Sequence, residues 1–143
     1  MLVNRSPATF LSRRYVHSLG NLKMDIPQIH SEADGAIGTM GQIHLAAGKQ
    51  VAMRQWREDP GQYSESHCRD YETVGFLLTG VIEIELDGGK ATIEAGDSWL
   101  VPEGAPHRYR IVEPIVAIEA TSPPACFGDR DEMDSITHKQ HTS

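Results

Sequence analysis

The chain has 143 residues and a composition ordinary for one globular domain, with 39% hydrophobic and 23% charged side chains. Its formal net charge of −7 argues against nucleic-acid binding, because contacts to phosphates need clustered Lys and Arg side chains. Its apolar runs are far shorter than the roughly 20 residues that a membrane-spanning helix requires. We therefore expect neither a nucleic-acid nor a membrane partner.

Residues 1–37 are expected to form an N-terminal arm or extension outside the folded domain. The first 24 residues contain four Lys or Arg side chains and no acidic one, a composition that is also typical of a mitochondrial presequence. Both interpretations stay open. The only cysteines, Cys68 and Cys126, fit a reducing compartment. We therefore expect a cytoplasmic protein, with the mitochondrion as the alternative.

Residues 38–123 show a regular succession of short alternating strands and tight turns. The predicted strands cover 42–45, 50–56, 81–86, 90–94, 98–101, 108–112 and 115–120. An Asp87-Gly88 turn joins the third strand to the fourth, since both residues tolerate the positive φ angles of such hairpins. This pattern predicts an all-β barrel or sandwich. Residues 124–143 are polar and are expected to form a loosely ordered C-terminal tail.

Two stretches within this region carry a distinctive spacing. They read Gly61-x5-His67-x-Arg69-x3-Thr73-x6-Gly80 and Gly96-x5-Pro102-x-Gly104-x2-His107. The spacing resembles the two motifs of the cupin family, G-x5-H-x-H-x3-E-x6-G and G-x5-P-x-G-x2-H-x3-N. The first stretch departs from its motif at two positions: Arg69 stands where the family has its second metal-binding His, and Thr73 stands where the family has its Glu.

The resemblance implies a small single-domain cupin of the RmlC-like type. Its fold would be the cupin-type antiparallel β-barrel, also called a double-stranded β-helix. The family resemblance further implies a homodimer, often formed through exchanged N-terminal strands. It also implies that the strand pairs of the two motifs face each other across the barrel, so that His67 and His107 both point inward near one mouth.

Strand alternation sorts the side chains of the first motif. His67, Arg69 and Thr73 are separated by even numbers of positions, so an undisturbed strand places them on one face and Glu72 on the other. The inward wall would then carry His67, Arg69, Thr73 and, from the second motif, His107. Because the planar fork of an Arg side chain matches a carboxylate, we expect these residues to bind a small organic anion, such as a carboxylate, a phosphate or a sugar acid.

A second hypothesis makes the protein a metal-dependent enzyme, for example an oxygenase, an isomerase or a lyase. A β-bulge downstream of Glu72 would turn this carboxylate inward. His67, Glu72 and His107, assisted by Glu65, would then suit Zn, Mn, Fe or Ni. Arg69 opposes this hypothesis, since each unit of like charge at about 4 Å costs roughly 4 kcal/mol at an effective dielectric constant near 20. A metal-free enzyme with a His as general base is a variant.

Overall fold

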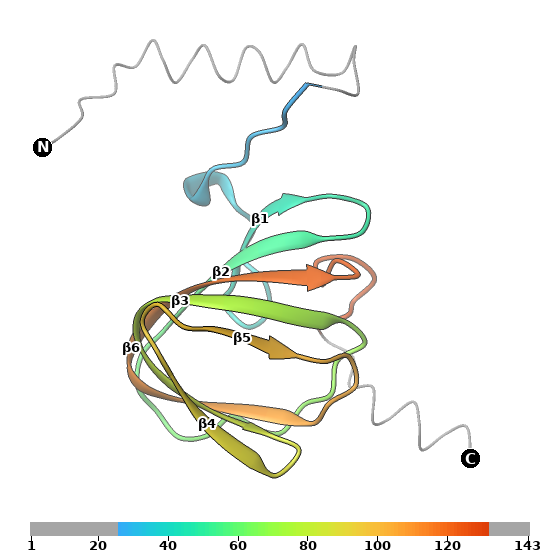
Figure 1. Cartoon of the computed structure of the whole chain (residues 1–143). Helices are drawn as coiled ribbons and strands as arrows, with labels where there is room; N and C mark the ends of the chain where they lie inside the picture. The colour runs from blue at the N-terminus through green and yellow to red at the C-terminus, as the bar shows by residue number, and fades with distance from the viewer. Residues whose placement is uncertain (1–25, 132–143) are drawn as a thin grey trace, which may run out of the picture.

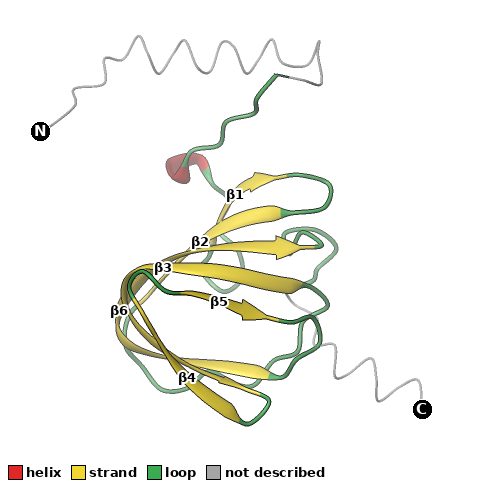
Figure 2. Ribbon diagram, viewed as in Figure 1, coloured by secondary structure: helices red, strands yellow, loops and turns green. Residues whose placement is uncertain are grey.

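The computed structural model describes residues 26–131, in which six antiparallel strands form one sheet that curls into a barrel (Figures 1 and 2). The predicted all-β fold is confirmed. The strands are β1 (Ile43–Ala47), β2 (Ala52–Glu58), β3 (Glu72–Leu86), β4 (Gly89–Glu94), β5 (Ser98–Val101) and β6 (His107–Ser122), preceded by a short 3₁₀ helix, η2 (Glu32–Asp34).

Residues 1–25 and 132–143 lie outside the described residues. The choice between an arm and a presequence for residues 1–24 therefore stays a prediction, as does most of the C-terminal tail. Between residues 26 and 131 there is no helix of sufficient length and apolar character to cross a membrane.

The two long strands, β3 and β6, hold the barrel together because each takes part in both halves of the sheet. The strand order is β1-β2-β6-β3-β4, with β5 paired to β3. The first part of β3 pairs with β5 and with the end of β6, whereas its last part pairs with β4 and with the start of β6. The sheet thereby folds over itself and encloses a core.

The sequence predicted two strands over 108–112 and 115–120, whereas β6 runs through Pro114 without a break. Pro114 falls between the paired residues Glu113 and Val116, in a stretch where the register against β3 shifts. A proline is tolerated at such an irregularity because no regular ladder bond is lost there. Gly80, opposite, has φ +91°, and a Cβ atom on it would lie only 2.2 Å from the Pro114 carbonyl oxygen.

The hairpin between β3 and β4 turns at Asp87-Gly88 as predicted. Asp87 has φ 48° and Gly88 has φ 84°, both in the left-handed region that a two-residue turn of this kind requires. Gly96 in the second motif has φ 94° and makes the corner before β5. These local turns need no long-range contact, which is why the sequence alone predicts them.

The register shift between Leu77 and Ile82 reverses the faces of β3. Before the shift, odd-numbered residues such as Thr73 and Leu77 are buried; after it, even-numbered residues such as Ile82 are buried. The bulge that the metal hypothesis invoked therefore exists, but it leaves Glu72 exposed on the outer face. The bulge changes which side chains are buried only in the part of β3 that follows it.

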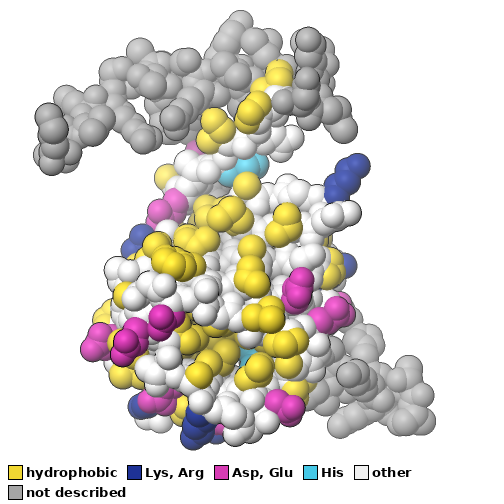
Figure 3. All heavy atoms as spheres, in the orientation of Figure 1, with side chains coloured by type: hydrophobic (Ala, Val, Ile, Leu, Met, Phe, Trp, Pro, Cys, Tyr) yellow, Lys and Arg dark blue, Asp and Glu magenta, His cyan; other side chains and the backbone are white. Residues whose placement is uncertain are grey.

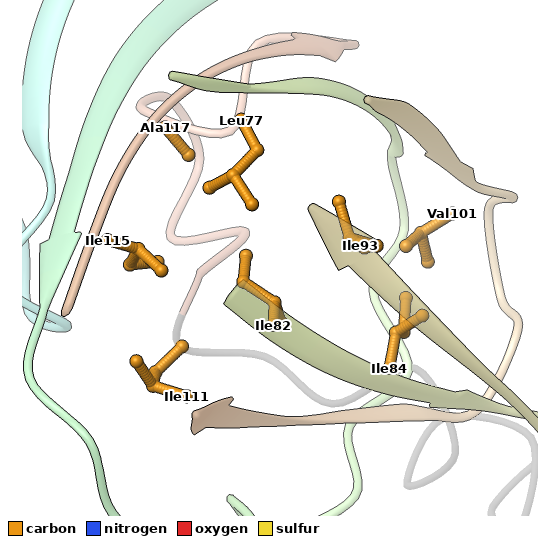
Figure 4. Close-up of a cluster of buried hydrophobic side chains, with 8 residues drawn as sticks. All are labelled: Leu77, Ile82, Ile84, Ile93, Val101, Ile111, Ile115 and Ala117. Atoms are coloured by element: carbon orange, nitrogen blue, oxygen red, sulfur yellow. The ribbon is translucent and has the colours of Figure 1, made fainter. Parts of the chain in front are cut away.

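Apolar side chains from both halves of the sheet fill the enclosed core. Figure 4 shows this cluster, which comprises Leu77, Ile82, Ile84, Ile93, Val101, Ile111, Ile115 and Ala117. The outer face of β3 and β5 is apolar as well, since Val74, Phe76, Leu78 and Leu100 are about half exposed. Hydrophobic side chains are spread over the face of the molecule that Figure 3 presents.

Two adjacent leucines test the assignment of faces in β3. Leu77 is 0% exposed and Leu78 is 48% exposed. We expect Leu77→Ala to lower the free energy of unfolding by about 2–5 kcal/mol, because it leaves a cavity in the core. Leu78→Ala, the matched control, should cost well under half as much. Urea denaturation of both variants measures the difference, and equal losses would contradict the described faces.

Candidate functional site

A cavity of about 300 Å³ lies between β2, β6 and the segments that precede β1 and β3. This volume is at the lower end of the range for small-molecule sites, roughly 300–1,000 Å³. Three of the residues singled out in the sequence line it, namely His67, Arg69 and His107. The cavity is therefore the place where the two motifs meet.

His67 and His107 are direct neighbours, and they do not face each other across the barrel as the family resemblance implied. The two residues form an isolated antiparallel bridge. The amide of each donates a hydrogen bond of 2.9 Å to the carbonyl oxygen of the other. Side chains of a directly opposed antiparallel pair lie on the same side of the ladder, so both imidazoles reach the same cavity.

His107 is held as a neutral imidazole with a defined tautomer. Burial lowers its pKa from the ordinary value, and the positive charge of Arg69 acts in the same direction, against the opposing effect of the hydrogen bond to Ala105. The Nδ1 atom lies 2.9 Å from the Ala105 carbonyl oxygen and, in the neutral ring, donates its proton there. The Nε2 lone pair is therefore the part of the ring that remains for a ligand.

Arg69 connects the loops of the two motifs. Its carbonyl oxygen accepts a hydrogen bond of 2.8 Å from the amide of Gly104 in the second motif. Its side chain is buried in the cavity wall, and Nη2 lies 3.7 Å from the Sδ atom of Met40. The cavity thus contains a permanent positive charge next to the two imidazoles.

Three other predicted residues do not line the cavity. Thr73 is buried in β3, where it pairs with Val101 of β5 and Thr121 of β6. Glu72 and Glu65 are exposed. Within residues 26–131, no three His, Cys, Asp or Glu side chains are grouped so that they could hold a metal ion. The described residues therefore do not fit the metal centre that the family resemblance suggests.

The cavity wall also contains a buried ion pair that the sequence motifs do not indicate. Arg54 of β2 lies opposite Glu119 of β6, and its Nε atom donates a hydrogen bond of 3.2 Å to Glu119 Oε1. Burial by itself lowers the pKa of Arg54, but Glu119, Tyr71 and Asp131 outweigh this effect and raise it above the ordinary value. In the sequence, this pair is indicated by a charged residue at an inward-facing position of each of two strands. Their pairing depends on a register that the sequence does not reveal.

Tyr71, which the motif spacing did not single out, is a part of this wall. It is 3% exposed, lines the cavity and donates a hydrogen bond of 2.5 Å to Asp131 Oδ1. Burial raises its pKa, so the phenol stays protonated and remains a donor. Trp56 and Tyr109 supply an aromatic part of the lining, with their rings edge to face and 5.0 Å apart.

The buried ion pair yields a stability prediction. We expect Arg54→Met to cost about 3–5 kcal/mol of unfolding free energy, because it leaves the carboxylates of Glu119 and Asp131 buried without their cation. Glu119→Ala should cost clearly less, because Arg54 keeps its ion pair with Asp131. Thermal and urea denaturation of the wild type and of both variants measure the effect. A Glu119→Ala protein less stable than Arg54→Met would contradict this account.

Comparison with known proteins places the fold. The model of the cupin domain family matches residues 54–120. No curated protein sequence matches the chain. Among solved structures, an RmlC-like cupin from Shewanella frigidimarina is similar, with a TM-score of 0.62 and 19% identity over 76% of this chain and 97% of that one. The structure of KdgF from Halomonas sp. is also similar, with a TM-score of 0.61 and 19% identity over 68% of this chain and 94% of that one.

A third similar structure, TT1209 from Thermus thermophilus, has a TM-score of 0.56 and 21% identity, over 68% of this chain and 99% of that one. At these identities the structural likeness concerns the fold alone. Together with the match to the family model, it confirms the assignment that the two motif spacings suggested. Residues 54–120 are a cupin domain, and the chain has the fold of the RmlC-like cupins.

Proposed function

We propose that this cupin binds a small organic anion in its cavity through Arg69, His67 and His107. The observation that carries the proposal is the position of Arg69, whose guanidinium shares the cavity wall with both imidazoles. A buried cation of this kind favours a ligand with a carboxylate, a phosphate or a sugar-acid group. Thr73, which the sequence analysis included in the ligand site, has no place in this proposal.

His107 acts as a neutral partner in the proposed site. Because the pKa of His107 is lowered, its ring is uncharged near neutral pH and offers an acceptor at Nε2. It suits a hydroxyl or a protonated group on the ligand, whereas Arg69 takes the anionic group. The proposed ligand therefore carries one acidic group and at least one hydrogen-bond donor close to it.

Substitution of Arg69 tests the proposal. We expect Arg69→Gln to weaken the binding of small carboxylates, phosphates and sugar acids by about tenfold or more, because it removes a charge-assisted contact. Arg108→Gln, which removes a partly exposed arginine paired with Glu85, is the matched control and should leave affinity unchanged. Isothermal titration of a ligand panel measures both. Equal affinities of wild type and Arg69→Gln for every bound acid would contradict the proposal.

Arg69→His tests the same position through its effect on metal affinity. This change restores the imidazole that the family motif has there and removes the fixed positive charge. We expect it to increase the affinity for Zn²⁺, because no neighbouring cation then repels the metal ion. The affinity for acids should fall, because the positive charge that attracts them is gone. Zinc titrations of both proteins decide the matter. Stoichiometric binding of Zn²⁺ by the wild type would favour the metal-dependent enzyme instead.

His107 predicts how binding depends on pH. Its pKa in the ligand-free protein lies below the ordinary value of 6.5, and a ligand that donates a hydrogen bond to Nε2 lowers the pKa further, since this contact needs the uncharged ring. Binding should then release a proton between these two pKa values. We expect affinity to fall as the pH falls through the pKa of the ligand-free protein and to level off below the pKa of the complex.

Calorimetry in two buffers of different ionisation enthalpy measures this proton release. His107→Gln should abolish the part that comes from this residue, and an unchanged release in this variant would assign the effect elsewhere. The homodimer and the cytoplasmic location stay predictions.

A further inference from the structure

The cavity wall contains a second set of converging donors, and one carboxylate from the C-terminal segment already fills it. Asp131 Oδ1 accepts hydrogen bonds from Arg54 Nη1 at 2.9 Å and from Tyr71 at 2.5 Å. Asp131 Oδ2 accepts one from Gln42 Nε2 at 3.1 Å. The three donors come from three separate segments, and all three residues line the cavity.

This arrangement has the properties of a built carboxylate site. Gln42, Arg54 and Tyr71 are each less than one tenth exposed, and one of them carries a permanent positive charge. The orientation of the Gln42 side-chain amide is fixed by its oxygen, because Oε1 accepts a hydrogen bond of 2.9 Å from the Met40 backbone amide. The Nε2 group is therefore the one that faces Asp131. Convergent donors of this kind around both oxygens are the usual way in which proteins recognise a carboxylate.

Asp131 reaches the site on a segment without regular secondary structure. After β6 ends at Ser122, the following residues stay close to the end of this strand, because the Ala125 amide donates a hydrogen bond of 2.9 Å to Thr121 Oγ1. Residues 126–131 contain no strand or helix. Asp131 and Gln42 also line a second hollow, beside the segment that precedes β1. Gln42 belongs to both hollows, so the Asp131 contact lies at their common wall.

We propose that Gln42, Arg54 and Tyr71 form a carboxylate-binding site, that the chain fills it with its own Asp131, and that diacid ligands of the cavity compete with Asp131 for it. The site itself is independent of the function proposed above, whereas the competition rests on it. A ligand with two acidic groups would place one at Arg69 and the other at Arg54. Its binding would then release the segment that carries Asp131.

Acetate, a small monocarboxylate, tests the site by chemical rescue. The background is Arg69→Gln, which removes the first anion site from the measurement. In this background we expect Asp131→Ala to be stabilised by acetate in a saturable manner, at constant ionic strength adjusted with chloride. Arg69→Gln alone, and Arg69→Gln with Asp129→Asn, should show no such stabilisation. Asp129→Asn removes a negative charge from the same segment but none of the contacts to the three donors.

Melting temperature against acetate concentration is the measurement. If the double variant with Asp131→Ala does not fold in chloride, the site predicts that acetate restores the β-sheet circular dichroism spectrum. Equal responses of all three proteins, or no response of the Asp131→Ala protein above that in chloride, would overturn the site.

The competition is tested with Arg69 present. Succinate should bind Asp131→Ala about tenfold or more tightly than the wild type, because the internal competitor is gone, whereas acetate should gain no such factor at Arg69. In the wild type, succinate should also increase amide hydrogen exchange in residues 126–131. Equal succinate affinities of the two proteins would overturn the competition. Failure of the wild type and of Asp131→Ala to bind any acid at Arg69 would overturn the proposed function, and the acetate experiment would still decide the site.

Discussion

The pairing of β3 with β6, and the irregularity halfway along it, determine the rest of the structure. Without the register shift between Leu77 and Ile82, β3 and β6 would pair as one regular ladder along their whole length. With it, one sheet supplies two walls, and the buried side chains of β3 change from odd to even positions. Gly80 permits the close approach to the Pro114 carbonyl that the bend requires. The same bend lets β6 begin beside the loop of the first motif, so that His107 meets His67.

Two basic side chains of the cavity wall have pKa values shifted in opposite directions, and the difference lies in their neighbours. Arg54 is desolvated but lies between the carboxylates of Glu119 and Asp131, which more than offset the loss of hydration. His107 is desolvated next to Arg69 and His67, so the charged form of its ring is disfavoured. Arg54 therefore keeps its charge at all ordinary pH values, whereas the imidazole of His107 is uncharged near neutral pH.

The features that could be predicted from the sequence are those with a local cause. The Asp87-Gly88 turn, the all-β fold and the common side of His67 and Arg69 follow from turn chemistry, period-two alternation and motif spacing. Arg54 and Glu119 are 65 positions apart, and their contact depends on the register of β2 against β6. Such a register is set by the packing of the whole sheet, so alternation within each strand could reveal a buried charge but not its partner.

The aromatic part of the wall gives the protein an optical probe of its own. The chain has two tryptophans, and both contact the same tyrosine. The Trp99 indole nitrogen lies 3.3 Å from the Tyr109 hydroxyl, and the Trp56 ring lies edge to face against the Tyr109 ring. Since Trp56 and Tyr109 line the cavity, displacement of water by a ligand changes the polarity around an indole. Intrinsic fluorescence thus reports the filling of this cavity without any label.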